Sequence, residues 1–340
     1  MTILVTGAAG FIGFHVAQAL LERGDRVVGI DSFNTYYDPQ LKRDRIAQLA
    51  GPRGAGLFRM LQLDFADAAA LDHALAGTHL RAIVHLGAQA GVRYSLTNPH
   101  AYLQSNLVGH GNLLELARRQ QVAHFVYASS SSVYGNSSAV PFDVDARVDH
   151  PVSLYAATKK SNELMSETYA HLYRLPATGL RFFTVYGPWG RPDMAVWDFT
   201  RRILEGEPVP VFNHGRLRRD FTHISDIVAG VLGALDKPPA DDGAAKPGGS
   251  VSPHAVYNLG NSRPEQLDRL LSLLEEACGR PALLDMQPMQ PGDVLETYAD
   301  IAASQRDFGY APKTALEDGI PDFVAWFKSR RAEARPKDAA

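Results

Sequence analysis

The first 130 residues alternate between short β-branched runs and longer stretches with helical periodicity, and this alternation constrains the fold more than any other feature of the chain. Thr2–Thr6 predicts a strand, and after a glycine-rich turn residues 11–23 show an amphipathic helical pattern that ends at Gly24. Further strands are predicted at Arg26–Asp31, 57–63, 82–86 and 124–129. Strands that alternate with helices build βαβ units, so the pattern predicts an α/β fold with a doubly wound parallel sheet.

The alternation of predicted strands and helices changes after about residue 180, where proline and glycine become more frequent and the predicted elements become shorter. We therefore expect residues 1–180 to form the domain built on the parallel sheet, with segments near 220–260 returning to it. Residues 181–330 are expected to form mainly a smaller α+β domain for the substrate. Residues 237–253 are rich in Pro, Gly, Ala and Asp and are predicted to form a mobile surface loop, and the tail at 332–340 is expected to fray.

The composition excludes several classes of partner. Lys and Arg total 34 against 37 Asp and Glu, a formal net charge of −3, so no basic surplus attracts nucleic acid or an anionic membrane surface. No apolar run approaches the roughly 20 residues of a membrane helix, and the start MTILVTG lacks the basic region of a signal peptide. Cys278 is the single cysteine, so no intramolecular disulfide can form, and the 12 histidines lack metal-ligand spacing. We expect a cytoplasmic protein without a metal site.

The glycine-rich turn predicts a site for a dinucleotide. Gly7, Gly10 and Gly13 follow the first strand and open the first helix, where small residues let the backbone approach a pyrophosphate and the helix N-terminus receives its charge. The spacing G-x-x-G-x-x-G is a variant of the Rossmann fingerprint. Asp31 ends the second strand, where a carboxylate can accept both hydroxyls of the adenosine ribose, and the three residues after it carry no cation for a 2′-phosphate. The pattern therefore favours NAD over NADP.

A tyrosine and a lysine predict the catalytic group. Tyr155 and Lys159 stand at i and i+4 of a helical segment, so the phenol and the ammonium share one face. A phenol with a pKa near about 10 is a poor base at neutral pH, and a nearby ammonium and an oxidised nicotinamide both favour the phenolate, so we expect the two together to lower the pKa of Tyr155. Ser130 lies in a run of four serines that ends the fifth predicted strand. Ligands bind at that edge of a doubly wound sheet, so the Ser130 hydroxyl can share the proton of a substrate.

Eight stretches of the chain resemble the extended short-chain dehydrogenase/reductases of the nucleotide-sugar epimerase type. They are TGAAGFIG (6–13), DSFNTYYD (31–38), HLGAQAGVRYS (85–95), ASSSSVYG (128–135), PVSLYAATKKSNE (151–163), RFFTVYGPWGRPDMA (181–195), RRDFTHISD (218–226) and QPGDV (290–294). The YYD, AGVRYS and RFFTVYGPWGRPDMA stretches are more typical of the UDP-glucuronate 4-epimerase branch. The resemblance implies a Rossmann domain over residues 1–180 that binds NAD tightly, and a domain over mainly residues 181–330 that binds a UDP-sugar.

The reaction implied by the resemblance is the 4-epimerisation of UDP-glucuronate to UDP-galacturonate through a 4-keto intermediate. By the family pattern, Tyr155 is the base that takes the proton from O4, Lys159 holds Tyr155 and the nicotinamide ribose, and Ser130 lies beside the reacting oxygen. NAD acts as a resident catalyst, so there is no net redox change.

The resemblance also implies the cofactor contacts. Asp64 and Phe65 are placed to meet the adenine, although Asp64 can equally be an ordinary acid at the end of a strand. Besides Tyr155 and Lys159, the implied cofactor contacts are Gly7, Gly10, Phe11, Ile12, Gly13, Asp31, Asn34, Asp64, Phe65, Leu86, Gln89, Asn106 and Phe183.

The substrate contacts follow from the same resemblance. Arg191 and Arg219 would meet the pyrophosphate, for which a bidentate guanidinium is suited, and Asp293 would receive the uridine ribose. The implied substrate contacts are Ser130, Ser131, Ser132, Tyr155, Thr184, Arg191, Val211, Arg219 and Asp293.

A uronate substrate poses a chemical problem at the intermediate. Its 4-keto form is a β-keto acid, which loses CO₂ when the breaking bond aligns with the carbonyl π system. An epimerase must hold the carboxylate out of that alignment, and Ser131, Ser132 and Thr184 are the residues that we expect to do so. Packing of Thr184 beneath its strand is the alternative reading of that residue.

Three other functions stay open. The first is a 4-epimerase of another UDP-hexose, which would not need the hydroxyls proposed for the carboxylate. The second is a UDP-glucuronate decarboxylase, whose family usually places a glutamate within the serine run. The third is a non-catalytic regulator that binds NAD(H), which the intact catalytic residues oppose.

A homodimer is the expected assembly. The helices at 103–120 and Leu154–Tyr173 usually pair across a dimer in this family and form a four-helix interface. Apolar residues compatible with that role are Leu107, Leu114, Leu164 and Met165.

Overall fold

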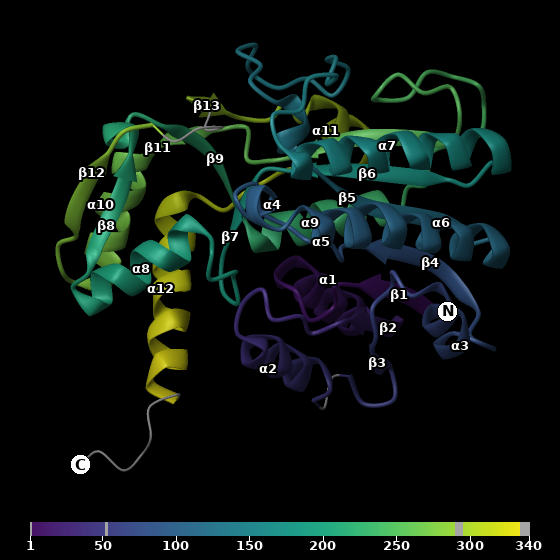
Figure 1. Cartoon of the computed structure of the whole chain (residues 1–340), viewed down its shortest axis with the longest axis horizontal. Coiled ribbons are helices and arrows are strands. Elements are labelled where there is room, and N and C mark those ends of the chain that lie inside the picture. Colours follow the sequence, from purple (N-terminus) through teal and green to yellow (C-terminus); the bar gives the residue numbers. More distant parts are fainter. Residues whose placement is uncertain (1, 52–53, 290–294, 334–340) are drawn as a thin grey trace.

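The computed structural model describes residues 2–51, 54–289 and 295–333. Within them, seven strands form one parallel sheet in the order β10-β6-β5-β4-β1-β2-β3 (Figure 1). The strands are β1 (Thr2–Thr6), β2 (Arg26–Asp31), β3 (Phe58–Gln62), β4 (Leu80–His85), β5 (His124–Ser130), β6 (Ala177–Phe182) and β10 (His254–Leu259). The doubly wound Rossmann sheet predicted from the sequence is therefore confirmed. Its first five strands lie within two residues of the predicted bounds.

Helices cover both faces of this sheet because alternate side chains of its strands are apolar on both sides. Against one face pack α1 (Phe11–Glu22), α9 (Ile224–Leu235) and α11 (Ala302–Phe308), in a core with Ile3, Val5 and Val84. Against the other pack α3 (Ala68–Ala74), α6 (Gly109–Gln120) and α7 (Leu154–Tyr173), in a core with Leu4, Ile83 and Phe125. The predicted helix at 103–120 is wound as a π-helix over Leu103–Val108 before α6 begins.

A smaller part of the chain is drawn beside the large sheet in Figure 1. Its apolar side chains form a third core of their own. It contains α8 (Ala195–Glu205), α10 (Leu267–Cys278), α12 (Leu316–Glu333) and the parallel pair β8 (Pro208–Phe212) and β12 (Leu283–Gln287). A further small sheet joins β9 (Arg218–His223) to β7 (Thr184–Tyr186), β11 (Pro264–Gln266) and β13 (Glu296–Thr297). Between these elements the chain returns to the large sheet through α9 and β10.

Several short elements surround the carboxyl ends of the large sheet. They are α2 (Pro39–Leu49), α4 (Tyr94–Thr97), α5 (Pro99–Tyr102) and the 3-10 turn Ser131–Tyr134. The segment 237–253 forms no helix or strand, and it is tied down by an Arg174–Asp241 ion pair and by a 2.7 Å hydrogen bond from the Gly248 N–H to Asp145. The predicted mobility of this segment stays a prediction, and all but the first two residues of the tail at 332–340 lie outside the described residues.

The strand order reverses between β1 and β4, and this arrangement places the site. In doubly wound sheets the ligand crevice lies at such a point, beyond the carboxyl ends of the strands. Among the described residues, no helix is long and apolar enough to cross a membrane.

Candidate active site

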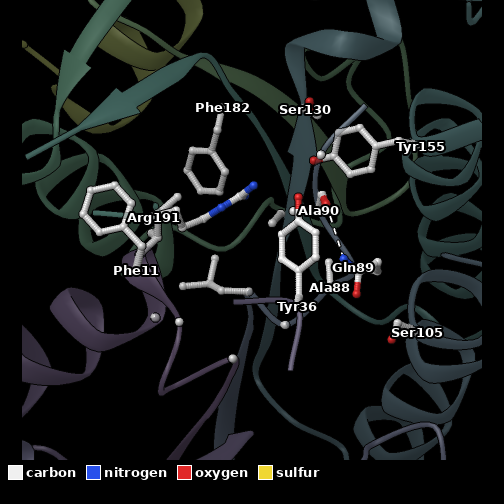
Figure 2. Close-up of a pocket in the computed structure, with 18 of the residues that line it drawn as sticks. Phe11, Tyr36, Ala88, Gln89, Ala90, Ser105, Ser130, Tyr155, Phe182 and Arg191 are labelled. Atoms are coloured by element: carbon white, nitrogen blue, oxygen red, sulfur yellow. Dashed lines mark hydrogen bonds between the residues drawn. The ribbon is translucent and has the colours of Figure 1, made fainter. Parts of the chain in front are cut away.

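One pocket extends along the carboxyl ends of β1, β2, β4 and β5 and reaches the start of α7 (Figure 2). Its floor is the glycine-rich turn between β1 and α1, which needs glycine at two positions. Gly7 has a left-handed φ of +67°, and a Cβ on Gly13 would lie 2.1 Å from the Gly7 carbonyl oxygen. The turn therefore packs backbone on backbone and leaves the N-terminus of α1 open to the pocket, which fits a dinucleotide pyrophosphate.

The pocket collects most of the predicted site residues. Those that line it are Gly7, Gly10, Phe11, Ile12, Gly13, Asp31, Asn34, Asp64, Phe65, Leu86, Gln89, Ser130, Ser131, Ser132, Tyr155, Lys159, Phe183, Thr184 and Arg191. They come from the ends of separate strands and from α7, so the fold brings together residues that are far apart in the sequence.

Three predicted residues lie elsewhere, and a fourth is not among the described residues. Asn106 is not part of the lining, but its amide holds both backbone groups of Gln89, at 2.9 Å to the N–H and 3.0 Å to the carbonyl. Val211 is fully buried among the apolar residues of the third core, because its strand β8 packs that face against α8 and α10. Arg219 lies outside the lining and donates to the Arg218 and Leu295 carbonyls. Asp293 lies outside the described residues.

The end of β2 presents Asp31 to the pocket together with a cation that the sequence argument missed. Lys42 of α2 has its ammonium 3.5 Å from an Asp31 carboxylate oxygen and 2.9 Å from the Asn34 side-chain oxygen. The expectation that no cation stands beside Asp31 is thus wrong, because it considered only the next three residues in the chain. Asp31 keeps its free carboxylate oxygen for a ribose hydroxyl, and Lys42 lines the same end of the pocket.

The acid after β3 has two roles at once. Asp64 lines the pocket, and one of its oxygens accepts a 2.9 Å hydrogen bond from the Ala66 N–H. The turn therefore uses one oxygen and leaves the other available, so both sequence-based readings of Asp64 remain compatible with the geometry.

The catalytic residues lie at the opposite end of the pocket. Ser130 closes β5, and Tyr155 and Lys159 occupy the first turns of α7, which Ser153 caps by accepting a 3.1 Å hydrogen bond from the Ala156 N–H. Figure 2 shows Ser130 and the Tyr155 hydroxyl on the same side of the pocket. Lys159 is buried and donates a 2.8 Å hydrogen bond to the Ala128 carbonyl.

Burial has the largest effect on the pKa of Tyr155 among the protein groups. Burial raises the pKa of Tyr155, and the Ser130 side chain and the positive charge of Arg191 act in the opposite direction without outweighing it. Burial lowers the pKa of Lys159 to about 8, and its ammonium donates to the Ala128 carbonyl.

Several serine and threonine hydroxyls lie close together at the end of the pocket that contains Tyr155. The Ser130 hydroxyl accepts a hydrogen bond from the Ser132 N–H and donates one to the Ser132 hydroxyl, each at 3.1 Å. Ser131 and Thr184 line the pocket beside them. The cluster offers donors to an anionic or hydroxylated group of a ligand and contains no carboxylate.

Arg191 supplies a positive charge to the same pocket. Its side chain extends between Phe182 and Tyr36 toward the side where Tyr155 lies (Figure 2). Asp193 pairs with it, and the distance from the Arg191 Nε to the Asp193 Oδ1 is 3.0 Å. Burial opposes this charge, but the carboxylate of Asp193 keeps the pKa of Arg191 above its usual value.

Several lining residues were absent from the sequence prediction, notably Tyr36, Lys42, Phe182 and Met194. Tyr36 belongs to the YYD stretch, which the family resemblance marked as typical of one branch without indicating a role. No pattern in the sequence distinguished Lys42 from a solvated lysine. Among the described residues, no group of three or more His, Cys, Asp or Glu side chains could hold a metal ion.

Comparison with known proteins agrees with this geometry. The family model described as "NAD dependent epimerase/dehydratase family" matches residues 3–260. A Rhizobium meliloti protein named probable UDP-glucuronate 4-epimerase is 45% identical over 96% of this chain and 97% of its own. The crystal structure of a Bacillus cereus UDP-glucuronic acid 4-epimerase with UDP-glucuronic acid and NAD is 32% identical, with a TM-score of 0.84 over 97% of this chain and all of that chain. A Tyr-to-Phe variant of the same enzyme, solved with a fluorinated UDP-sugar and NAD, matches equally well.

The family resemblance inferred from the sequence motifs is thereby confirmed over nearly the whole chain. The glycine cradle and the Asp31 carboxylate lie where a Rossmann fold binds a dinucleotide, and Ser130, Tyr155 and Lys159 line the same pocket. The protein is a member of the NAD-dependent epimerase/dehydratase family.

Proposed function

We propose that the protein is an NAD-dependent UDP-glucuronate 4-epimerase, which interconverts UDP-glucuronate and UDP-galacturonate. One observation carries the proposal: the Ser130, Tyr155 and Lys159 group faces a pocket whose catalytic end has hydroxyls and an arginine, in a chain 45% identical to a probable enzyme of this activity. The cofactor is NAD, and it is expected to remain bound through turnover.

Tyr155 acts as the general base on the O4 hydroxyl of the sugar. NAD supplies the redox chemistry when bound, since it takes a hydride from C4 and returns one to the opposite face of the keto sugar. Tyr155 takes the O4 proton as the ketone forms and returns it when the alcohol is restored, so protons and hydride balance over the cycle. The Ser130 hydrogen bond and the Arg191 charge lower the pKa of Tyr155 against the effect of burial, and so help it to act as a base.

Lys159 and Ser130 assist the phenol in different ways. Ser130 is within hydrogen-bonding reach of the Tyr155 oxygen and so helps to hold O4 beside it. Lys159 is directed to the Ala128 carbonyl and is proposed to hold the nicotinamide ribose from that position. A pKa of about 8 keeps most of Lys159 charged at neutral pH, which suits a hydrogen-bond donor to ribose hydroxyls.

The uronate carboxylate is proposed to rest on Ser131, Ser132 and Thr184. These hydroxyls line the catalytic end of the pocket and can hold a carboxylate by hydrogen bonds, so that the bond to CO₂ stays out of line with the C4 carbonyl. The absence of a carboxylate from the serine run Ser129–Ser132 argues against the decarboxylase alternative, whose family usually carries glutamate there.

Replacing Thr184 tests whether its hydroxyl helps to hold the uronate carboxylate. Thr184→Val keeps the shape and removes the hydroxyl, so we expect part of the keto intermediate to lose CO₂ and a UDP-pentose to appear beside UDP-galacturonate. Proton NMR of the sugar products measures the ratio of the two. Thr222→Val, a buried threonine outside the pocket lining, is the matched control. Full epimerisation by Thr184→Val without any pentose would remove Thr184 from this role.

The nucleotide half of the substrate is proposed to lie toward the smaller part of the chain, mainly residues 181–330. Arg191 and Arg219 would contact the pyrophosphate, and Asp293 the uridine ribose. Arg191 supports this most directly, since it already lies in the pocket. Residues 1–180 would then hold NAD, with α9 and β10 completing their sheet and core.

We propose a homodimer that forms through α7 and the helix that spans the π-turn and α6. Leu103, Val108, Leu164 and Leu172 support it, because these apolar side chains are exposed on adjacent helices. Leu114 cannot contribute, because it is fully buried in the chain's own core. We also propose a cytoplasmic location, since the single cysteine leaves no disulfide that would need an oxidising compartment.

A charge placed in the proposed interface should dissociate the dimer. Leu164 is 56% exposed, and Leu164→Glu would bury a carboxylate against the partner helices, so the variant is expected to sediment as a monomer while the wild type sediments as a dimer. Leu284→Glu, at a residue that is 46% exposed on β12, is the control and should leave the wild-type sedimentation unchanged. A Leu164→Glu dimer as stable as the wild type would place the interface elsewhere.

The function itself is tested by incubating the purified protein with UDP-glucuronate and no added NAD, and following the sugar by proton NMR. We expect UDP-galacturonate with its carboxylate retained, formed by cofactor that purifies with the protein. A UDP-pentose as the main product would instead identify a decarboxylase. No reaction, even after NAD is added, would point to another UDP-hexose or to a non-catalytic NAD(H)-binding protein.

A further inference from the structure

Three stretches that the sequence marked as typical of one family branch meet around a single side chain. Tyr36 comes from the YYD stretch at 31–38, Gly91 from the AGVRYS stretch within 85–95, and Asp193 from the stretch at 181–195. All three lie against the guanidinium of Arg191 or against its direct partners. Tyr36, Gly91 and Asp193 are not among the proposed catalytic residues, so the proposed catalysis does not explain why they meet at Arg191.

The contacts around Arg191 leave its guanidinium little freedom. Asp193 accepts from two nitrogens of Arg191, the Nε at 3.0 Å and the Nη2. The Tyr36 hydroxyl donates to the same Asp193 oxygen that the Nη2 uses, at 3.1 Å. Asp193 is thereby held from both sides, so its carboxylate cannot turn without breaking a hydrogen bond to Tyr36 or Arg191.

Gly91 makes room for this arrangement. It has a left-handed φ of +98°, and a Cβ there would lie 2.8 Å from the Tyr36 hydroxyl oxygen. The ring of Tyr36 packs against Tyr94, with 4.9 Å between ring centroids. A glycine at this point therefore lets the Tyr36 hydroxyl reach Asp193 across the pocket.

The backbone just before Arg191 is fixed from its other side by a buried arginine. Arg45 of α2 is fully buried and donates to the Trp189 carbonyl at 2.6 Å and to the Gly190 carbonyl at 2.9 Å. The same side chain donates to the Ala9 carbonyl of the glycine-rich turn at 2.8 Å. The segment that carries Arg191 is thus tied directly to the turn proposed for the cofactor.

We propose that Tyr36 and Asp193 are positioning residues, which hold the Arg191 guanidinium in the pocket so that it meets the anionic UDP-sugar without reorganisation. The inference rests on the proposed function for the identity of the substrate. It assigns a role to the YYD stretch, where Tyr36 acts only through Asp193 and Arg191. A guanidinium held in its bound orientation contributes more affinity, because the ligand does not have to immobilise it.

The same pair of charges acts on the catalytic phenol. Tyr155 shares the pocket with Arg191, Lys159 and Ser130, and its ring lies 6.0 Å from that of Tyr102. The charge of Asp193 also acts on its phenol. The positive charge of Arg191 lowers the pKa of Tyr155 and the negative charge of Asp193 raises it. Removing only the negative charge should therefore favour the phenolate.

Tyr36→Phe tests the positioning role, with Tyr94→Phe as the matched control. Tyr94 loses an equivalent hydroxyl whose partner is the Asn98 amide, and it does not line the pocket. We expect Tyr36→Phe to raise both KM and the calorimetric Kd for UDP-glucuronate by about tenfold, with kcat within about twofold of the wild type. Tyr94→Phe should leave all three constants within about twofold. An unchanged Kd in Tyr36→Phe, or equal losses in both variants with lowered melting temperatures, would overturn the proposal.

The pH dependence of kcat/KM in Asp193→Asn provides a second test, because a purely structural role of Asp193 would not change it. The acid limb of kcat/KM, where Tyr155 must lose its proton, should shift to lower pH in this variant and stay in place in Tyr36→Phe. An unmoved limb in Asp193→Asn would contradict the arrangement of charges. If the wild type binds UDP-glucuronate without epimerising it, the proposed function fails, and the Kd values still decide the role of Tyr36.

Discussion

Tyr155→Phe is expected to lower kcat for epimerisation by roughly 10²- to 10⁴-fold, which is the usual contribution of a positioned general base. The change removes only the phenolic oxygen, so the ring can still pack beside Tyr102 and the pocket keeps its shape. The remaining hydroxyl nearby, on Ser130, is a much weaker base and cannot replace the phenol. Binding of UDP-glucuronate and NAD should change by less than about threefold.

Turnover is measured by NMR, and binding by calorimetry on the same preparation. Tyr169→Phe is the matched control on the same helix, because its hydroxyl binds Glu115 at the surface, far along α7 from the pocket. It should keep wild-type kcat. A Tyr155→Phe enzyme with more than about a tenth of wild-type kcat would place the base elsewhere in the pocket.

The second large effect concerns stability and lies directly behind the serine run. Arg181 and Glu163 form a buried ion pair, with 2.8 Å between the Arg181 Nε and the Glu163 Oε1. Ser129 donates to the same Glu163 oxygen at 2.7 Å, and Tyr134 accepts from Arg181 at 2.9 Å. The pair therefore joins α7, β6 and the end of β5, the three elements that position the catalytic group.

Glu163→Ala is expected to lower the free energy of unfolding by about 3–5 kcal/mol, because it leaves the Arg181 guanidinium buried without a counter-charge. Urea unfolding followed by circular dichroism at fixed protein concentration measures the loss. Lys160→Gln is the control, since Lys160 is half-exposed and 3.5 Å from the same carboxylate, and should cost less than about 1 kcal/mol.

A double variant separates the ion pair from simple packing. Glu163→Leu with Arg181→Met replaces both charges by apolar groups, and should be less destabilised than Glu163→Ala alone because no buried charge is left unpaired. Equal losses in the double and single variants would mean that volume, and not charge, decides the stability at this point.

The fold could be predicted from the sequence in large part because its signals are local. The β-branched runs, the helical periodicity and the terminating glycines each act within about 15 residues, and they predicted β1 to β5 and α1 almost to the residue. The glycine turn and Asp31 were found for the same reason. The turn needs glycine at positions 7 and 13, so its geometry can be recognised from its own residues.

The candidate site was predictable only where a local motif or the family resemblance marked it. Lys42 was missed because it reaches Asp31 from α2 and not from the residues that follow the strand. Val211 was assigned to the substrate, but β8 directs it into the third core. The effect of burial on the pKa of Tyr155 was missed, because the i, i+4 spacing says nothing of how deeply the phenol is buried or of the Ala128 carbonyl that binds the Lys159 ammonium.

The sequence by itself determined the parallel sheet and the dinucleotide turn, because short-range sterics and hydrogen bonding specify both of them. It also marked Ser130, Tyr155 and Lys159 as candidate catalytic residues, through local motifs and the family resemblance. Only the tertiary structure decided what surrounds those side chains. The hydrogen bonds of Tyr36 with Asp193 and of Arg45 with the Trp189 carbonyl join residues 157 and 144 positions apart. Burial and charge at such meeting points depend on the whole packed fold, so no local pattern in the chain can predict them.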